Sequence, residues 1–343
     1  MLTKIKEIIF YSHREPFPDF LRGTALILMI QVHLTELLLI DIPDYKLFIG
    51  WSLFFGSIPA APIFLILMGY YLAKSSLPFE QEIVRAIKLF LLGLTLNILM
   101  NFSLLLKFIN REVQIDPFQY ILGADILLFA SLSILLIAFI KQKTSNIYIY
   151  AVLILLSFIL GGINFSKFRE LILFKYFLHF FFPINDWSYF PLFPWFAYPL
   201  TGFILSRFDF LNKLKNIHIN TYIWAVYLLI LILTYNFGFD VSNDLSKYYG
   251  HNFLFYLWGL YFLFGWVKLL LTIFEKFIDN FIIQYIKWLG KNVTIVYFFQ
   301  WILIGNIATY LYHSLTLENY FIELGLILLI ISICTYLYSL SKG

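Results

Sequence analysis

Apolar runs of about twenty residues recur along the whole chain, and they limit its fold more than any other feature. Charged residues make up only 13% of the sequence, against about 25% in soluble domains. A helix of about twenty apolar residues spans a hydrocarbon layer of roughly 30 Å. The sequence therefore predicts an all-α polytopic membrane protein with about ten transmembrane helices, and it excludes a soluble globular domain. The ten runs lie at roughly 20–40, 48–73, 84–101, 117–140, 147–163, 189–207, 220–239, 252–274, 289–311 and 320–340.

The basic residues indicate how these helices cross the membrane. An even number of spans places both termini on one side, and it puts seventeen of the 24 Lys and Arg residues on that side and seven on the other. Lys and Arg accumulate on the cytoplasmic side of membrane proteins, so both termini are predicted to be cytoplasmic. The net charge of +4 follows from this distribution, and we expect no nucleic acid among the partners.

No linker, repeat or low-complexity tract divides the sequence, so residues 1–343 are predicted to form a single transmembrane domain. Residues 1–19 are expected to be a cytoplasmic or interfacial segment, with a short interfacial helix at 4–12, because no apolar core and cleavage site mark a signal peptide. The connection at 164–188 mixes apolar and basic residues, and we expect it to lie in the outer interface, where it would roof an external opening.

Ionisable side chains are costly to bury inside a span, and the first span carries several on one helical face. His33 lies about thirteen residues into this span, beyond the middle of the bilayer. Arg22 lies eleven residues earlier, and eleven steps of about 100° bring the two to one face, about 16 Å apart. Asp19 and Glu36 share that face. An imidazole exchanges a proton near neutral pH, so this ladder indicates a path for a reaction or for transport.

Asp125 is the second prominent ionisable residue, about eight residues from the outer end of the run at 117–140. A carboxylate at that depth faces a hydrated cavity, pairs with a polar group or stays protonated. Asp125 and Glu36 are the two candidates for orienting His33, because a carboxylate bonded to an imidazole fixes its tautomer. The alternative is structural, with His33 as a core histidine and Arg22 as an interfacial anchor.

Uncharged polar residues mark further candidate positions. Asn97 and Gln300 lie inside the third and ninth spans, where amides also join helices through hydrogen bonds. Trp195 lies among three prolines in PLFPWFAYPLTGF at the outer start of the sixth span. Prolines there free backbone carbonyls, although a Trp at this place is also an ordinary interfacial anchor. The sequence has no Gly-rich phosphate loop and no metal-spaced Cys or His cluster, so we expect no metal.

Five stretches of the sequence, taken in order, carry a resemblance to a known family. The most specific is DFLRGTALILMIQVH, and the others are APIFLILMGYYLAKS, FQYILGADILLFASLSILL, FPLFPWFAYPLTGFILSR and IKWLGKNVTIVYFFQWIL. Together they resemble the heparan-alpha-glucosaminide N-acetyltransferase family, whose bacterial members share a ten-helix plan. The Arg22 to His33 spacing is also that of acyltransferase family 3, the other branch of the same transmembrane group. Two departures are Gln300, where many relatives carry His, and Phe196 with Ala197, which follow Trp195 in place of a Gly-bearing turn.

The resemblance implies transfer of an acetyl or other acyl group from cytoplasmic acetyl-CoA to a hydroxyl or amine of a sugar or glycan acceptor. His33 would act as general base or as transient acyl acceptor, with Asp125 or Glu36 orienting its ring. The CoA phosphates suit guanidinium and ammonium groups, and the candidates to bind the donor are Arg22, Lys287, Lys291 and Asn292. The candidates to contact the acceptor are Trp195, Asn97 and Gln300.

Two other functions compete with this interpretation. In a secondary transporter, Arg22, His33 and Asp125 would form a proton relay or bind an anionic substrate, but we find neither the repeats nor the interrupted helices of such proteins. In a structural or signalling membrane protein, the polar groups would only join helices. The short N-terminus and the lack of a lumenal domain favour a bacterial plasma membrane, so membrane lipids are the expected surroundings.

Overall fold

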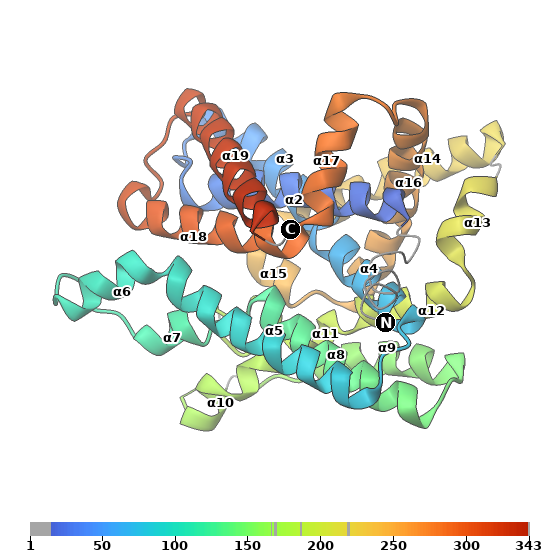
Figure 1. Ribbon diagram of the computed structural model, residues 1–343, viewed down its shortest axis with the longest axis horizontal. Helices are drawn as coiled ribbons and strands as arrows, with labels where there is room; N and C mark the ends of the chain where they lie inside the picture. Colours follow the sequence, from blue (N-terminus) through green and yellow to red (C-terminus); the bar gives the residue numbers. More distant parts are fainter. Residues whose placement is uncertain (1–14, 166, 168–169, 186, 218–219, 342–343) are drawn as a thin grey trace.

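The computed structural model describes residues 15–165, 167, 170–185, 187–217 and 220–341, and this part of the chain is helical (Figure 1). Within it, β pairing is limited to an isolated bridge between Leu39 and Leu315. The all-α fold class is therefore confirmed. The interfacial helix expected at 4–12 lies outside the described residues.

The helices follow one another in this order: α2 (Pro16–Leu37), α3 (Lys46–Ser57), α4 (Ala61–Lys74), α5 (Phe79–Met100), α6 (Phe102–Ile109), α7 (Pro117–Ile121), α8 (Ile126–Lys143), α9 (Ile147–Gly161), α10 (Ile172–Tyr176), α11 (Leu192–Trp195), α12 (Ala197–Arg207), α13 (Phe210–Asn216), α14 (Thr221–Ser242), α15 (Leu245–Tyr249), α16 (Phe253–Lys276), α17 (Phe281–Lys291), α18 (Val293–Leu311) and α19 (Leu317–Leu340). Two short 3-10 helices, η1 (Pro43–Tyr45) and η3 (Leu178–Phe180), lie in connections.

Eight helical segments of the described chain are long and apolar enough to cross a membrane, so the protein is polytopic. They are α2, the segment Pro43–Lys74 with α3 and α4, α5, α8, α14, α16, α18 and α19. They match eight of the ten expected spans. The other two, at 147–163 and 189–207, contain the shorter helices α9 and α12, which pack against each other. The number ten and the cytoplasmic termini stay predictions.

Three of the expected spans are interrupted. The expectation that the chain lacks interrupted helices was therefore wrong. The runs at 48–73, 117–140 and 189–207 divide into α3 and α4, α7 and α8, and α11 and α12. Pro59 lies in the first break and Pro194 in α11, and a proline lacks the backbone N–H that a continuous helix uses. The second break contains Gly123, which weakens a helix relative to Ala. The spans were predicted from the length of the apolar runs, and that length does not show where a helix breaks.

Helix α2, which carries the ladder of ionisable residues, touches α17 through two glycines. A Cβ at Gly23 would lie 1.8 Å from the carbonyl oxygen of Ile286, and a Cβ at Gly290 would lie 1.8 Å from the carbonyl oxygen of Asp19. Only glycine fits at such distances, so the two backbones are in direct contact. This contact fixes the first turns of α2 within the bundle.

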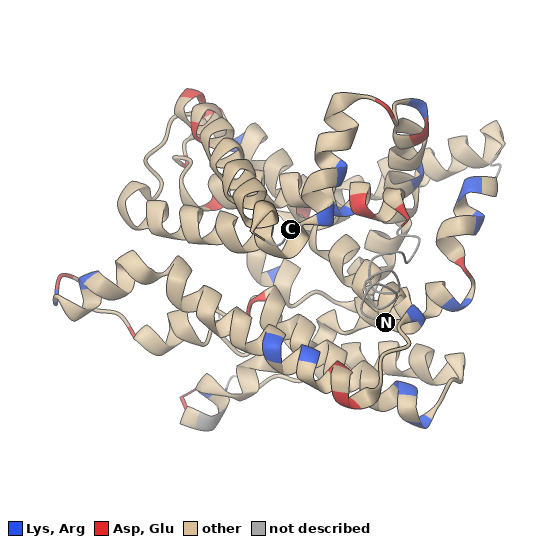
Figure 2. Cartoon of the chain, viewed as in Figure 1, with Lys and Arg blue, Asp and Glu red and all other residues tan. Residues whose placement is uncertain are grey.

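Most Lys and Arg residues lie toward the end of the molecule that contains α13 (Figure 2). We call this the basic end, and its helix termini carry Arg22, Lys74, Lys141 and Arg207. Ion pairs join neighbouring helices there, as between Lys141 Nζ of α8 and Glu82 Oε1 of α5 at 3.0 Å. Helices α2, α5 and α18 begin near the basic end and run away from it, whereas α8 runs toward it.

The segment at 164–188 packs over the start of α8. The Ala124 N–H donates to the carbonyl oxygen of Trp187 at 3.3 Å, and the Phe190 N–H donates to that of Ala124 at 2.8 Å. Lys175 Nζ lies 2.7 Å from Asp116 Oδ2, and this hydrogen bond raises the pKa of the Lys175 ammonium. The segment therefore covers the turn that precedes Asp125. Its place in the outer interface stays a prediction.

Candidate active site

A cavity of about 910 Å³ enters the bundle from the basic end. The cations that line its mouth are Arg22 of α2, Lys74 of α4, and Arg85 and Lys88 of α5. Its walls are mostly apolar and include Phe64, Leu65, Met68, Leu89, Leu92, Ile126, Leu127, Ala130 and Ile134. Met29 and Tyr297 lie about two helical turns farther along α2 and one turn into α18, so they mark the inner end. We call this space the main cavity.

Two of the four mouth cations already have partners in the protein. Arg22 Nη1 donates to Asp19 Oδ1 at 2.8 Å, and the sequence places these two residues on one face of the helix. The guanidinium of Arg22 also lies over the ring of Tyr71, 4.9 Å from its centroid. Lys74 Nζ donates to Asp209 Oδ1 at 3.3 Å. These contacts hold both side chains at the mouth of the main cavity.

The other two mouth cations are exposed and have no such partner. Arg85 and Lys88 lie three residues apart, on one face of α5. Neither forms an ion pair with another described residue. Their charges are therefore available to an anion that enters the main cavity.

Asp125 and Tyr297 form a buried pair at the inner end. Asp125 immediately precedes α8, and its Oδ1 accepts a hydrogen bond from the Tyr297 hydroxyl at 2.7 Å. Its other oxygen, Oδ2, is buried without a hydrogen-bond partner. Asn97 Nδ2 donates to the carbonyl oxygens of Ile121 and Gly123 at 3.0 and 2.9 Å, and so holds the turn that presents Asp125. An acceptor oxygen without a partner is available to a substrate N–H or O–H.

His33 lies one helical turn beyond the inner end and packs on Trp301. Their ring centroids are 4.0 Å apart, and the planes are inclined by 34°. Nδ1 of His33 is buried without a partner, as is Nε1 of Trp301. His33 lies four residues after Met29 and Trp301 four residues after Tyr297, a rise of about 6 Å on each helix. His33 and Asp125 thus contact neighbouring turns of α18, His33 through Trp301 and Asp125 through Tyr297.

Neither of the two carboxylates expected to orient His33 forms a hydrogen bond with it among the described contacts. Asp125 bonds to Tyr297, and Glu36 forms no hydrogen bond or ion pair with another described residue. Glu36 instead lies within electrostatic range of Tyr249, in α15. Burial, and after it the charge of Glu36, raises the pKa of the Tyr249 hydroxyl. The ring of His33 is therefore positioned by stacking on Trp301 rather than by a carboxylate.

Three residues expected at the donor site lie beside the main cavity rather than in its described lining. Lys287 and Lys291 belong to α17, and Asn292 lies in the turn between α17 and α18. Asn292 Nδ2 donates to the carbonyl oxygen of Trp288 at 2.9 Å, which closes the end of α17. The next residues, Val293 and Thr294, do line the cavity. A role for these three polar residues in donor binding stays a prediction.

The residues expected to contact the acceptor are buried within the bundle. Trp195 has no exposed surface, and its Nε1 donates to the carbonyl oxygen of Tyr249 at 2.9 Å. Gln300 is fully buried, its Nε2 lies 3.5 Å from Met29 Sδ, and its Oε1 has no partner. Asn97 supports the turn before Asp125, as described above. Trp195 and Asn97 thus position neighbouring backbone, and Asn97 Oδ1, like Gln300 Oε1, is an acceptor oxygen without a partner.

Sequence reasoning missed the cavity-lining roles of Arg85, Lys88 and Tyr297. Arg85 and Lys88 both precede the apolar part of the run at 84–101, at the side where Arg22 was expected. This shared side was the feature of the sequence that could have indicated a role for Arg85 and Lys88 beside Arg22. Tyr297 belongs to the stretch IKWLGKNVTIVYFFQWIL, but nothing in a single sequence shows that it meets Asp125.

Comparison with known protein families identifies the family of the chain. The family model for heparan-alpha-glucosaminide N-acetyltransferase, catalytic, matches residues 14–236, which is more than half of the chain. The chain belongs to this family. It is thus a membrane acetyltransferase, and the resemblance noted from DFLRGTALILMIQVH is confirmed. Comparison with curated proteins and with solved structures gives no match.

The described residues of the acetyltransferase bring together three side chains that suit acyl transfer. No three His, Cys, Asp or Glu side chains in this part of the chain gather in a way that could hold a metal ion. His33 supplies an imidazole, Asp125 a carboxylate oxygen without a partner, and Tyr297 a fixed hydroxyl. These are the groups that acyl transfer uses to move protons and to orient reactants.

Proposed function

We propose that this acetyltransferase transfers an acetyl group from acetyl-CoA, bound in the main cavity, to a hydroxyl or amine of a sugar or glycan that reaches His33 from the opposite end. The observation that carries the proposal is the main cavity itself. It combines a cationic mouth with apolar walls, and it ends at Tyr297, one turn short of His33. The basic end is then cytoplasmic, as the distribution of Lys and Arg indicates, and we place the protein in a bacterial plasma membrane.

The side chains of the main cavity fit the parts of acetyl-CoA in order. Arg85, Lys88 and Arg22 would bind the phosphates, since guanidinium and ammonium groups form charge-assisted bonds with phosphate oxygens. The apolar walls suit the long, largely uncharged arm that carries the thioester. A volume of about 910 Å³ falls in the range of pockets that take small molecules and cofactors. The thioester would then lie near Tyr297.

His33 acts as the general base in this scheme. Its imidazole takes the proton from the acceptor hydroxyl or amine as that group attacks the thioester carbonyl. A C–O or C–N bond forms, the C–S bond breaks, and the thiolate that leaves takes the proton back from the imidazolium. Trp301 keeps the ring in place, and apolar walls reduce hydrolysis of the thioester by keeping water out.

The acceptor approaches from the end opposite to the donor. Glu36 lies one turn beyond His33 on α2, without a partner among the described residues, and Tyr249 lies within its electrostatic range. Such oxygen atoms suit the hydroxyl and amino groups of a sugar. The free Oδ2 of Asp125 would accept a hydrogen bond from the same ligand. The segment at 164–188 covers this region and so limits access to it.

The experiment that tests the proposal uses protein reconstituted in liposomes, with labelled acetyl-CoA on the side of the basic end and a set of amino sugars and neutral sugars on the other. We expect label in a sugar of the opposite compartment and free CoA on the donor side. Movement of intact acetyl-CoA or of a proton-coupled solute, without acetylated product, would instead establish a transporter that uses Arg22, His33 and Asp125.

A further inference from the structure

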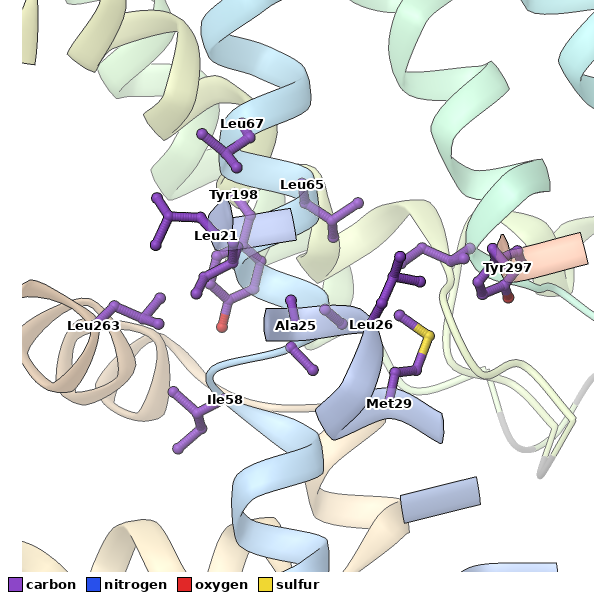
Figure 3. Packing of buried hydrophobic residues seen from close by; sticks show 14 of the residues in the cluster. Leu21, Ala25, Leu26, Met29, Ile58, Leu65, Leu67, Tyr198, Leu263 and Tyr297 are labelled. Atoms are coloured by element: carbon purple, nitrogen blue, oxygen red, sulfur yellow. The ribbon is translucent and has the colours of Figure 1, made fainter. Parts of the chain in front are cut away.

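The inner end of the main cavity is closed by two side chains, Tyr297 and Met29, each held by one hydrogen bond. Tyr297 is 5% exposed, and its hydroxyl is fixed by the hydrogen bond to Asp125. Met29 is 6% exposed, and its thioether sulfur accepts a hydrogen bond from the side chain of Gln300. Both belong to the same buried core as Leu26 and Leu65 (Figure 3).

A buried amide lies directly behind Met29. Gln300 Nε2 is 3.5 Å from Met29 Sδ, and Gln300 has no exposed surface. Met29 therefore separates the main cavity from Gln300, whose Oε1 has no partner. Because Tyr297 is fixed and Gln300 blocks the space behind, the room at the inner end depends on the Met29 side chain.

We propose that Met29 sets the length of the acyl group, so that the enzyme takes acyl donors of two or three carbons and rejects longer ones. This inference rests on the proposed function, because it requires an acyl-CoA in the main cavity with its thioester at the inner end. An acyl chain extends past the thioester carbonyl and is the first part of the donor to meet Met29. Each further methylene then collides with Met29 and, behind it, Gln300.

Shortening Met29 should extend the cavity toward Gln300. Met29→Ala removes three heavy atoms, which is comparable with two or three additional acyl carbons. A single methylene changes discrimination in an apolar pocket by about 10-fold to 200-fold. We therefore expect the ratio of kcat/KM for butyryl-CoA to that for acetyl-CoA to rise at least about 10-fold in Met29→Ala.

The experiment measures this ratio, with acetyl-, butyryl- and octanoyl-CoA, for the full-length protein and three variants. Met29→Leu keeps the volume and should keep the wild-type ratio. Met68→Ala makes the same truncation on the cavity wall nearer the mouth. It should change the KM of all donors alike and leave the ratio unchanged. Binding of CoA itself, which has no acyl group, checks that each variant retains the cavity.

The outcomes distinguish the role of Met29 from the proposed function as a whole. An unchanged ratio in Met29→Ala, with acetyl transfer retained, overturns the proposal while leaving the acetyltransferase function intact. Equal use of octanoyl-CoA and acetyl-CoA by the wild type overturns it as well, even if Met29→Ala does not fold. A wild type that binds no acyl-CoA refutes the proposed function, and the inference with it. A ratio that rises in Met29→Ala but not in Met68→Ala supports the proposal.

Discussion

The two ends of the main cavity are built in different ways. At the mouth, cations from three helices are available to bind the donor phosphates, and two of them, Arg85 and Lys88, are exposed. At the inner end, each polar group depends on one neighbour, as Asp125 does on Tyr297. Exposed charges contribute little singly and are screened by salt, whereas a buried group that loses its partner carries the full cost of desolvation. Donor affinity should therefore be a sum of small terms, and catalysis should depend on single residues.

The largest effect is expected for His33→Ala. Loss of a general base lowers the rate of transfer by about 10²-fold to 10⁴-fold, whereas the affinity for acetyl-CoA should not change, because His33 lies beyond the described lining of the main cavity. Rates and affinities measured on the same purified protein separate the two effects.

A histidine elsewhere provides the control for that variant. His313 lies in the turn between α18 and α19 and has a φ of 46°, which Asn tolerates, so His313→Asn should retain transfer. Full activity of His33→Ala would remove the general base from the mechanism.

A smaller but clear loss is expected for Tyr297→Phe. This change leaves both oxygens of Asp125 without a protein hydroxyl, at a cost of about 1–3 kcal/mol for an unpartnered buried group. Because Asp125 is then less well positioned at the inner end, we also expect kcat to fall roughly 10-fold to 100-fold. Tyr285→Phe removes a hydroxyl that lies 2.7 Å from Ser332 Oγ, between α17 and α19, and serves as the matched control. Equal kcat values for the two variants would show that the pair with Asp125 has no catalytic role.

At the mouth, Arg85→Ala combined with Lys88→Ala should weaken acetyl-CoA binding about 10-fold at low salt and leave kcat unchanged. The difference should shrink at high ionic strength, because the charges are exposed. Lys213→Ala with Lys215→Ala removes two cations of α13, also near the basic end but outside the described cavity lining. If this control loses as much affinity, the effect is one of general charge rather than of the mouth.

The smallest expected effect concerns the packing stability of the segment around His179, which covers the turn before Asp125. His179 has no exposed surface, its Nε2 lies 2.8 Å from the carbonyl oxygen of Leu122, and burial lowers its pKa to about 4. Its pKa in an unfolded segment is about 6.5. Between these values the unpacked segment binds a proton that the packed segment does not. The packing is therefore fully stable above about pH 6.5 and loses stability as the pH falls toward 4.

Hydrogen exchange of residues 170–185 at pH 7 and pH 5, corrected for intrinsic rates, measures this loss. We expect weaker protection at pH 5 in the wild type and no pH dependence from this position in His179→Gln. Equal protection of the wild-type segment at both pH values would contradict the assignment of the effect to His179.

Local features of the site could be predicted from the sequence, because they depend on helical spacing. The run at 20–40 is found as α2 at Pro16–Leu37, and the pair of Asp19 and Arg22 follows from residues three apart on one helix. The depth of His33 follows from the rise per residue in the same way.

Long-range features of the site could not be predicted in this way. Lys287 and Lys291 were expected at the donor site, but the face that α17 presents to α2 is set by the contact between Gly23 and Ile286. The partner of His33 is Trp301, more than two hundred residues away in the sequence, and no local pattern identifies it. Packing between distant helices decides such neighbours.

In the proposed function, the main cavity binds acetyl-CoA through its phosphates at the basic end. Calorimetric titration of the detergent-purified protein with acetyl-CoA, and with S-acetylpantetheine as the matched ligand without phosphates, tests it most directly. We expect saturable binding of one acetyl-CoA per chain and much weaker binding of S-acetylpantetheine. No saturable binding of acetyl-CoA, or equal affinity for both ligands, would contradict it.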